Sequence, residues 1–414
     1  MPSWPAPDVP ALAGEPVPVV LHDTATEEAR PIAPEDGTAL VYVCGITPYD
    51  ATHLGHASTY LAFDTLVRAL RQSGLRVRYA QNVTDVDDPL LERAAKTDQP
   101  WDELAQEQTD LFRSDMTALR VLPPDDYVRV QDVVDEIAGA VAELVANGFG
   151  YAVPTTGSLG GDDVYFDVQA AQDAAGFELA SVSHFSPERL AAAFVEFGGD
   201  PDRAGKRSPL DPLLWGAARE GEPAWPSAVG DGRPGWHVEC AVIAAGALGS
   251  RITLQGGGRD LRFPHHEMTS AHACALHGHA FADHYAHAGL VAYEGEKMSK
   301  SLGNLVLVSK LTAAGADPAA VRLVVLAHHY RSDWEWTDEL LDEAHARLER
   351  WRAAAARAAA GEAGTASVQA LRAAIADDLD TPTALRLVDA WAAEESPAAE
   401  LLPAIDALLG IDLR

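Results

Sequence analysis

Two histidines three residues apart, His53 and His56, are the first side chains whose type and spacing suggest chemistry. They follow a glycine-bearing turn after a short β-branched run, at a point where a helix is expected to begin. Side chains three apart share a helix face, and helix N-termini present free N–H groups, so both imidazoles could face one anionic ligand. Local capping and packing of the helix by the two rings is the competing interpretation, and the pair alone does not exclude it.

A second candidate is the basic segment at residues 296–304, which contains Lys297 and Lys300. The two lysines are three apart, are interleaved with serines and lie between glycines, as in a loop that can follow phosphate charge during a reaction. A solvated run of charges is the alternative interpretation of this segment.

Two cysteines, Cys44 and Cys240, and the histidine pair at 265–266 offer the soft donors that zinc prefers. A zinc ion with three protein ligands keeps one position open, and that position could take a substrate thiol as a thiolate. Such a site would select cysteine over serine and alanine more sharply than a small apolar pocket. A purely structural zinc is the alternative, although such sites usually have four closely spaced protein ligands.

These residues require elements that bring distant parts of the chain together. Residues 39–43 predict a strand, 57–73 a helix closed by Gly74, and 76–82 a second strand, which together form a βαβ unit and favour a parallel sheet. Further predicted elements are a strand at 17–21, helices at 101–119 and 133–147, a loop-rich insertion at 151–209, a strand at 252–254, a helix at 265–276, and helices at 340–360 and 368–375 on either side of a linker.

Length and composition limit the class of protein. The 414 residues predict two or three structural units, and an apolar fraction of 47% is ordinary for a folded chain. The net charge of −31 argues against a large nucleic-acid footprint. Three widely spaced cysteines predict a reducing, cytoplasmic compartment. Because the sequence has no long apolar run, we expect no targeting segment and no membrane partner.

The motifs at residues 53–56 and 297–301 read His-Leu-Gly-His and Lys-Met-Ser-Lys-Ser, and they resemble the two signatures of class I aminoacyl-tRNA synthetases. Together with these signatures, the segments at 43–45, 82–88, 235–240 and 263–267 resemble cysteinyl-tRNA synthetases in sequence and order. The resemblance covers roughly residues 17–304. It implies an α/β fold with a Rossmann catalytic domain, an inserted connective module and a C-terminal helical domain. The predicted boundaries start with an N-terminal strand extension at 1–35 and the first half of the catalytic domain at 36–132. The inserted module at 133–209 separates it from the second half of the catalytic domain at 210–304. A region like the stem-contact fold at 305–345 and the C-terminal helices at 346–414 follow.

The resemblance also implies roles for individual residues. The groups expected to stabilise the departing pyrophosphate are His53, His56, Lys297 and Lys300, and zinc is expected on Cys44, Cys240 and His265. The residues expected around cysteine and its adenylate are Cys44, Gly45, Ile46, Thr47, Thr59, Asn82, Val83, Thr84, Trp236, Gly258, Arg259, Asp260 and Val291.

The chain departs from the synthetase pattern at two of these places. It has Thr269 where an acidic fourth zinc ligand is typical, so Glu267, His272 or solvent could complete the shell. It also has Arg259 where serine is common. Cys274 is expected to be a small buried side chain and not a ligand.

The acceptor of the activated cysteine is suggested by the end of the chain. Residues 346–414 contain seven arginines, no lysine and eleven acidic residues, a net charge of −4, which does not favour RNA. The closer resemblance is to the cysteine ligases of mycothiol biosynthesis, truncated relatives of the synthetase. The segment Glu-Phe-Gly-Gly-Asp-Pro at 196–201 is similar to their Glu-Arg-Gly-Gly-Asp-Pro region, with Phe197 in place of the arginine and no role assigned to it.

The predicted function is therefore ATP-dependent ligation of L-cysteine to the amine of glucosaminyl-inositol through a cysteinyl adenylate. The expected partners are these small molecules and ATP with Mg²⁺, with one zinc per chain, no tRNA and no second subunit. A cysteinyl-tRNA synthetase and a non-catalytic paralogue that binds zinc and nucleotide are the alternatives.

Overall fold

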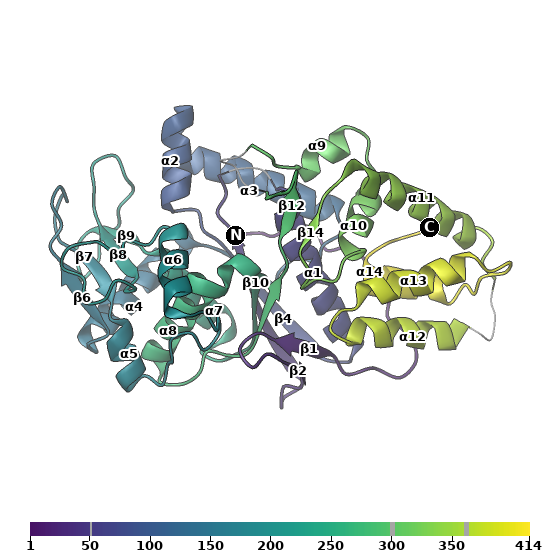
Figure 1. The fold of residues 1–414 in the computed structure, drawn as a ribbon, viewed down its shortest axis with the longest axis horizontal. Coiled ribbons are helices and arrows are strands. Elements are labelled where there is room, and N and C mark those ends of the chain that lie inside the picture. The colour runs from purple at the N-terminus through teal and green to yellow at the C-terminus, as the bar shows by residue number, and fades with distance from the viewer. Residues whose placement is uncertain (50–51, 299–302, 360–363) are drawn as a thin grey trace.

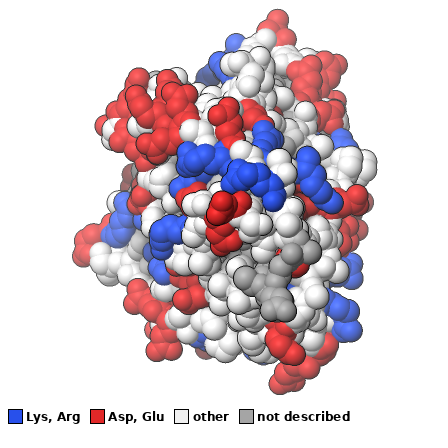
Figure 2. Space-filling model, turned by 90° about the vertical axis from the view of Figure 1, so that its right-hand side faces the viewer, with Lys and Arg blue, Asp and Glu red and all other residues white. Residues whose placement is uncertain are grey.

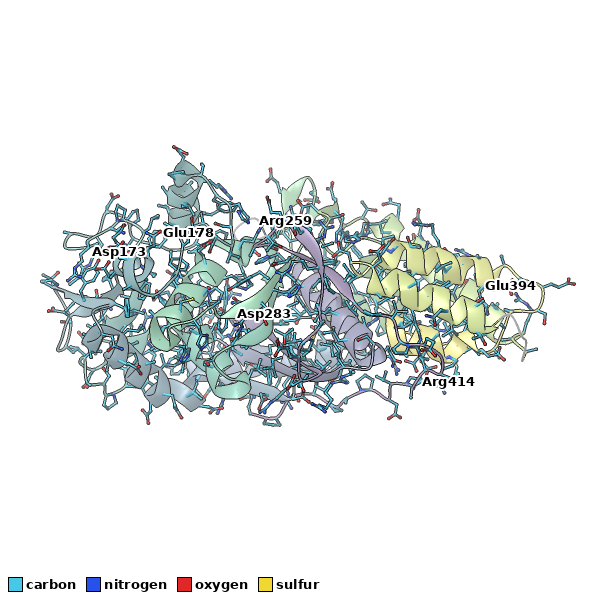
Figure 3. The ribbon with its side chains drawn as sticks, turned by 90° about the horizontal axis from the view of Figure 1, so that it is seen from below. Asp173, Glu178, Arg259, Asp283, Glu394 and Arg414 are labelled. Atoms are coloured by element: carbon cyan, nitrogen blue, oxygen red, sulfur yellow. The ribbon has the colours of Figure 1, made fainter. Side chains whose placement is uncertain are left out.

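The computed structural model describes residues 1–49, 52–298, 303–359 and 364–414, and it has three parts along its longest axis (Figure 1). A parallel sheet with helices on both faces lies in the middle. A second, smaller sheet with its own helices lies at one end, and the C-terminal helices lie at the other. In Figure 3 the ends are marked by Asp173 on the side of the smaller sheet and Glu394 on the side of the C-terminal helices.

The central sheet has five parallel strands in the order β11-β10-β3-β4-β5. Its strands are β3 (Thr38–Ile46), β4 (Arg76–Val83), β5 (Asp126–Arg129), β10 (Ile252–Gly258) and β11 (Ala282–Ala288). The middle strands consist mainly of buried residues, as expected for a sheet covered on both faces. The predicted parallel sheet is confirmed.

The helix α1 (Leu54–Gln72) links β3 to β4 and packs against the sheet. It is buried along most of its length because its apolar side chains face both the sheet and the C-terminal helices. On the other face lie α7 (Trp236–Leu248) and α8 (Glu267–His277), which contact each other and belong to a second hydrophobic cluster. The central sheet therefore has a separately packed layer of helices on each face.

The inserted module contains a four-stranded antiparallel sheet, ordered β6-β7-β8-β9. Its strands are β6 (Gly150–Val153), β7 (Asp163–Phe166), β8 (Leu213–Ala217) and β9 (Gly232–Pro234), and its helices are α4 (Val134–Ala146), α5 (Val168–Ala174) and α6 (Pro187–Glu196). The sheet differs from the sequence prediction in two ways. The segment expected to be loop-rich contains strands and helices, and β8 and β9 lie beyond the predicted module boundary at residue 209. Both differences arise because these short strands pair with partners far away in the sequence.

The C-terminal part is helical, as predicted, apart from the short strand β14 (Trp334–Glu335). Its helices are α9 (Val308–Ala313), α10 (Pro318–Leu326), α11 (Asp338–Ala355), α12 (Gly364–Ala376), α13 (Thr381–Ala392) and α14 (Leu401–Leu409). The helices α10, α12 and α14 contact α1, so this part is packed on the catalytic core.

The remaining elements are β1 (Val20–Asp23) and β2 (Glu28–Pro31), which form a hairpin, the helices α2 (Asp88–Thr97) and α3 (Trp101–Ala118), and the short strands β12 (Val291–Tyr293) and β13 (Glu296–Lys297). None of the helices in the described part of the chain combines the length and apolar character needed to span a bilayer.

Candidate active site

A single cavity of about 1220 Å³ lies between the central sheet and the inserted module. One side is formed by residues after the carboxyl ends of β3 and β10 and by the start of α1. The other side is formed by residues of β7, α6 and the segments around β8 and β9. Ligands of open α/β sheets bind outside the carboxyl ends of the strands, and the cavity lies at that edge.

The histidine pair lines the cavity at the start of α1. His53 is the N-cap residue, and its Nδ1 accepts a hydrogen bond from the backbone N–H of Gly55 at 3.1 Å. The rings of His53 and His56 are stacked with their centroids 3.8 Å apart. A Cβ on Gly55 would lie 2.8 Å from the His53 ring, so the motif needs glycine between the histidines. His53 therefore caps α1 and also faces the cavity.

Cys44, Cys240 and His265 form a buried cluster beside the cavity, with their three ligand atoms within 4.8 Å of one another. The two Sγ atoms are 3.9 Å apart, and Nε2 of His265 is 3.3 Å from Sγ of Cys240. Cys44 lines the cavity, whereas the other two lie behind it. Two sulfurs and one imidazole are a donor set that fits zinc.

The surroundings of the cluster prepare these donors for a metal. Burial and the neighbouring imidazoles lower the pKa of His265, so its ring is neutral, the form that binds metal ions. Its Nδ1 is hydrogen-bonded to Nδ1 of His237 at 3.0 Å, which leaves Nε2 for the metal. Burial raises the pKa of the Cys240 thiol, so the thiolate form needs a cation to stabilise it.

Two further contacts fix the orientation of the cluster. The ring of Trp236 stacks on His265, with centroids 4.1 Å apart, and Trp236 also lines the cavity. Behind Cys44, Nε2 of His266 lies 3.3 Å from the sulfur and Nδ1 is hydrogen-bonded to His287 at 2.8 Å. His287 in turn is hydrogen-bonded to Thr24.

The positions considered for a fourth ligand lie outside the cluster found among the described residues. Thr269 donates its hydroxyl to the carbonyl of His237. The carboxylate of Glu267 accepts hydrogen bonds from the backbone of Val182 and Ser183, so it is already engaged in the inserted module. His272 is buried against Phe166.

The structure places most of the predicted adenylate residues on the cavity, namely Cys44, Gly45, Ile46, Thr47, Thr59, Trp236, Gly258, Asp260 and Val291. Asn82, Val83 and Thr84 are buried next to it and are absent from its described lining. The side-chain oxygen of Asn82 accepts a hydrogen bond from the backbone N–H of Gly45 at 2.7 Å, and its amide donates to the Thr84 hydroxyl, so Asn82 fixes the end of β3. Arg259 is directed to Asp333 and to the carbonyl of Arg331, away from the cavity.

The basic segment lies partly outside the described residues. The strand β13 includes the backbone of Lys297, and Met298 lines the cavity. Lys300 lies in the interval 299–302, which the structure does not describe, so its predicted role stays a prediction.

Carboxylates that the sequence analysis did not single out also reach the cavity. Burial and the neighbouring Asp88 raise the pKa of Asp87 to about 7. Asp88 forms an ion pair with Arg233, whose Nε also donates to Glu222 at 3.0 Å. The pair connects α2 with β9, so it spans the two sides of the cavity. For the wall of the cavity formed by the inserted module, the only sequence pattern that indicated a functional role was the resemblance around residues 196–201. The other residues of this wall come from strands without a recognisable motif.

Comparison with known proteins places these features in a family. Residues 32–346 match the family described as tRNA synthetases class I (C) catalytic domain. The chain is 58% identical to an L-cysteine:1D-myo-inositol 2-amino-2-deoxy-alpha-D-glucopyranoside ligase of Clavibacter michiganensis subsp. michiganensis, over 100% of this chain and 99% of that protein. It is 55% identical to a ligase of the same name from Micrococcus luteus, over 100% of both chains.

Solved structures agree on the fold. A Mycobacterium tuberculosis methionyl-tRNA synthetase in complex with methionyl-adenylate superposes with a TM-score of 0.60, 18% identity, and coverage of 90% of this chain and 89% of that chain. A leucyl-tRNA synthetase (LeuRS) in a ternary complex from Agrobacterium radiobacter K84 gives a TM-score of 0.61, 12% identity, and coverage of 91% and 83%. The predicted class I synthetase-like fold is confirmed.

Proposed function

The chain belongs to the class I tRNA synthetase (C) family and, within it, to the L-cysteine:1D-myo-inositol 2-amino-2-deoxy-alpha-D-glucopyranoside ligases, and from this premise we propose how its residues carry out the ligation. The enzyme joins L-cysteine to the amine of glucosaminyl-inositol with consumption of ATP, as the sequence predicted. The observation that carries the mechanism is one continuous cavity that connects the His53 and His56 pair, the Cys44 corner of the donor cluster and the inserted module.

In the first step the carboxylate of cysteine attacks the α-phosphorus of ATP, and pyrophosphate leaves with the bond electrons. Negative charge grows on the departing oxygens, so donors fixed before the reaction lower the barrier. His53 and His56 face the cavity from the start of α1, where the helix N-terminus also favours an anion. We assign the pyrophosphate to this corner, with Mg²⁺ accompanying ATP. The action of Lys297 and Lys300 on the same phosphates stays a prediction from their motif.

Cys44, Cys240 and His265 are the residues that would hold zinc. When bound, zinc supplies an open position that takes the thiol of cysteine as a thiolate, and serine has no equivalent soft donor. Trp236 stacks on His265 and borders the cavity, so it orients a ligand residue and limits the space next to it. The donors and their hydrogen bonds to His237 and His266 support this assignment.

In the second step the amine of the sugar attacks the carbonyl of the adenylate and AMP leaves. In its ammonium form the sugar nitrogen has no free electron pair, so it must lose a proton before it attacks, and a carboxylate with a pKa near neutrality is suited to take that proton. Asp87 lines the cavity next to Thr47, and burial brings its pKa to about 7. We assign Asp87 as the proton acceptor of this step.

The acceptor is a small amine and not a tRNA. Figure 2 looks onto the C-terminal end of the molecule, where blue groups form a limited band among red ones. Two arginines of α11 are paired with carboxylates, Arg347 with Asp389 and Arg352 with Asp317, so these two offer little free charge to RNA phosphates. The relatives favour the ligase over both alternatives, a cysteinyl-tRNA synthetase and a non-catalytic paralogue. A cytoplasmic location and a monomeric state stay predictions of the sequence.

The first step can be tested without the acceptor. Purified enzyme with ATP, Mg²⁺ and labelled pyrophosphate should form labelled ATP when cysteine is present, and serine should not substitute for it. Exchange that needs no cysteine, or that proceeds equally with serine, would contradict the assignment of the cavity and its donor cluster.

A further inference from the structure

The cavity is larger than a cysteinyl adenylate requires. Pockets for small molecules usually measure about 300–1,000 Å³, and this one measures about 1220 Å³. The predicted adenylate residues account for the side next to the central sheet. The opposite side, on the inserted module, is lined by charged residues to which the steps above assign no role, among them Asp200, Arg203, Arg219 and Glu222.

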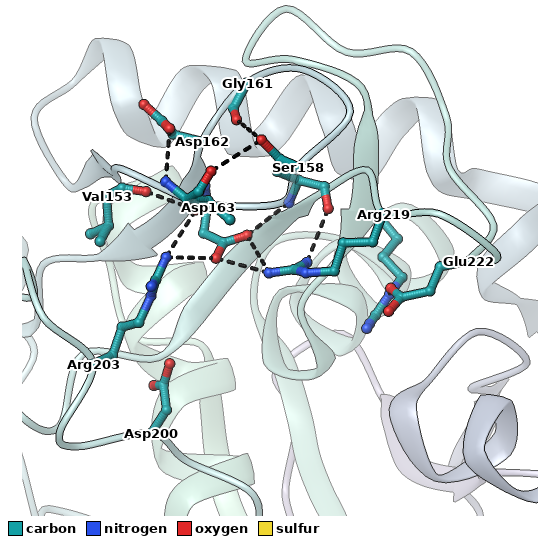
Figure 4. A network of polar contacts seen from close by, with 12 residues as sticks. Val153, Ser158, Gly161, Asp162, Asp163, Asp200, Arg203, Arg219 and Glu222 are labelled. Carbon is teal, nitrogen blue, oxygen red and sulfur yellow. Dashed lines mark hydrogen bonds and ion pairs between the residues drawn. The ribbon is translucent and has the colours of Figure 1, made fainter.

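Asp163 organises this side of the cavity (Figure 4). It is 3% exposed, and it accepts two hydrogen bonds from Nη2 of Arg219, both at 3.0 Å, and one from Nη2 of Arg203 at 3.2 Å. Arg203 also donates to the hydroxyl of Thr155, and Arg219 to the carbonyl of Ala217. About a third of each arginine side chain stays exposed, so both guanidinium groups are fixed in place while they border the cavity.

The acceptor groups on this side are fixed as well. Asp200 receives a hydrogen bond from the Tyr165 hydroxyl and another from Nζ of Lys206 at 2.9 Å. Glu222 is held by Nε of Arg233. These carboxylates are positioned by the fold before any ligand arrives, as binding groups need to be.

The mixture of charges indicates the kind of ligand. The arginines on this side are Arg203, Arg219 and Arg233, and the carboxylates are Asp163, Glu196, Asp200 and Glu222. Such a nearly balanced set does not fit an anion or a polycation. It fits a neutral ring of hydroxyl groups, because each hydroxyl both donates and accepts. The half-buried ring of Phe197 lies in the same lining and offers an apolar surface to the C–H face of such a ring.

We propose that Arg203 and Arg219, held by Asp163, together with Asp200 and Glu222, bind the inositol ring of the acceptor. This inference rests on the proposed function and adds to it the location of the acceptor's polyol part. With the ring held on the inserted module, the amine of the adjoining glucosamine can extend towards the adenylate on the central sheet. Residues 196–200 of the segment at 196–201 line the same side, so this segment then has a role in shaping the subsite.

The test compares two acceptors in two variants. Glucosaminyl-inositol and glucosamine both carry the amine, but only the first carries the inositol ring. We expect Arg203→Gln and Arg219→Gln each to raise the KM for glucosaminyl-inositol about tenfold or more, because a hydrogen bond from a charged donor is lost. The KM for glucosamine should change much less, so the preference for the complete acceptor should fall. Arg251→Gln is the matched control, since Arg251 is paired with Asp283 on the surface.

Cysteine-dependent pyrophosphate exchange separates the possible outcomes. If the variants keep the wild-type preference for glucosaminyl-inositol, or lose exchange in proportion to ligation, the subsite assignment is wrong. If loss of an arginine unfolds the module, Glu222→Gln gives the same test at a partly exposed position, with the same expected fall in preference. If the wild-type enzyme makes no amide with either acceptor, the proposed function itself fails, which is a different result from an unchanged preference.

Discussion

Replacing Asp64 by asparagine tests how the C-terminal helices are attached to the catalytic core. Asp64 on α1 is buried and pairs with Nε of Arg68 at 2.8 Å and with Nη2 of Arg322 on α10. Its other oxygen accepts the backbone N–H of Leu122 at 2.8 Å. Asparagine can keep the bond to Leu122 only if its NH₂ faces the two guanidinium groups, which are themselves donors.

The size of the effect follows from this geometry. Removing one partner of a buried ion pair costs about 3–5 kcal/mol, because the remaining charge stays buried without compensation. Here two guanidinium groups lose their shared carboxylate, although both keep backbone carbonyl acceptors. We therefore expect Asp64→Asn to lower the free energy of unfolding by about 3–5 kcal/mol, a large part of the total for most proteins.

The effect should also depend on pH. Burial would raise the pKa of Asp64, but Arg322 and Arg68 outweigh it, so the pKa in the folded state lies below its ordinary value. A lowered pKa stabilises the fold fully above the unfolded pKa of about 3.9, and this stabilisation is lost as pH falls through the folded pKa. The difference between wild type and Asp64→Asn should therefore be constant from about pH 5 to 8 and shrink below about pH 4.

Urea unfolding followed by circular dichroism at several pH values measures both quantities. Glu92→Gln is the control, because the pair Glu92–Lys96 is exposed and its loss should cost about 0.5 kcal/mol or less. An equal shift of the unfolding midpoint in Asp64→Asn and Glu92→Gln, or a difference from wild type that grows on acidification, would show that the buried pair does not stabilise the fold.

The remaining predictions concern the chemistry. The double substitution Cys240→Ala and His265→Ala should abolish stoichiometric zinc in metal analysis, whereas Cys274→Ala should leave it intact; full zinc in the double variant would disprove the ligand set. Lys300→Ala should raise the barrier to adenylate formation by about 2–4 kcal/mol with little change in cysteine affinity, and an unchanged exchange rate would show that the lysine is only a surface charge. Single-turnover amide formation in the wild type should rise with pH through about 7, and Asp87→Asn should lose this rise if Asp87 takes the proton; an unaltered pH profile would exclude it.

The parts of the fold that the sequence predicted are those with local signals. The helix expected at 57–73 is α1 (Leu54–Gln72), and the strand expected at 76–82 is β4 (Arg76–Val83), because apolar periodicity and a closing glycine mark both. The sheet of the inserted module was not predicted. Its strand β8 (Leu213–Ala217) is five residues long and pairs with β7 and β9 across long loops, and no local pattern records such pairing.

In the candidate site, too, the sequence predicted the residues that lie in recognisable motifs and missed those that do not. The motifs identified the cluster of Cys44, Cys240 and His265, which the structure brings together from three distant segments. The sequence did not identify Asp163 or its two arginines, because they are isolated charged residues with no characteristic spacing. Their arrangement becomes visible only when β7 and the neighbouring loops are folded against each other.

The acceptor distinguishes this enzyme from a tRNA synthetase, because activated cysteine is expected to pass to an amino sugar and not to RNA. The most direct measurement is to supply purified protein with cysteine, ATP and Mg²⁺ together with equal concentrations of glucosaminyl-inositol and cysteine tRNA, and to identify the products by mass spectrometry. We expect AMP and the cysteinyl amide of glucosaminyl-inositol, with the tRNA left uncharged. Cysteinyl-tRNA as the main product, with the amino sugar unchanged, would show that RNA is the acceptor.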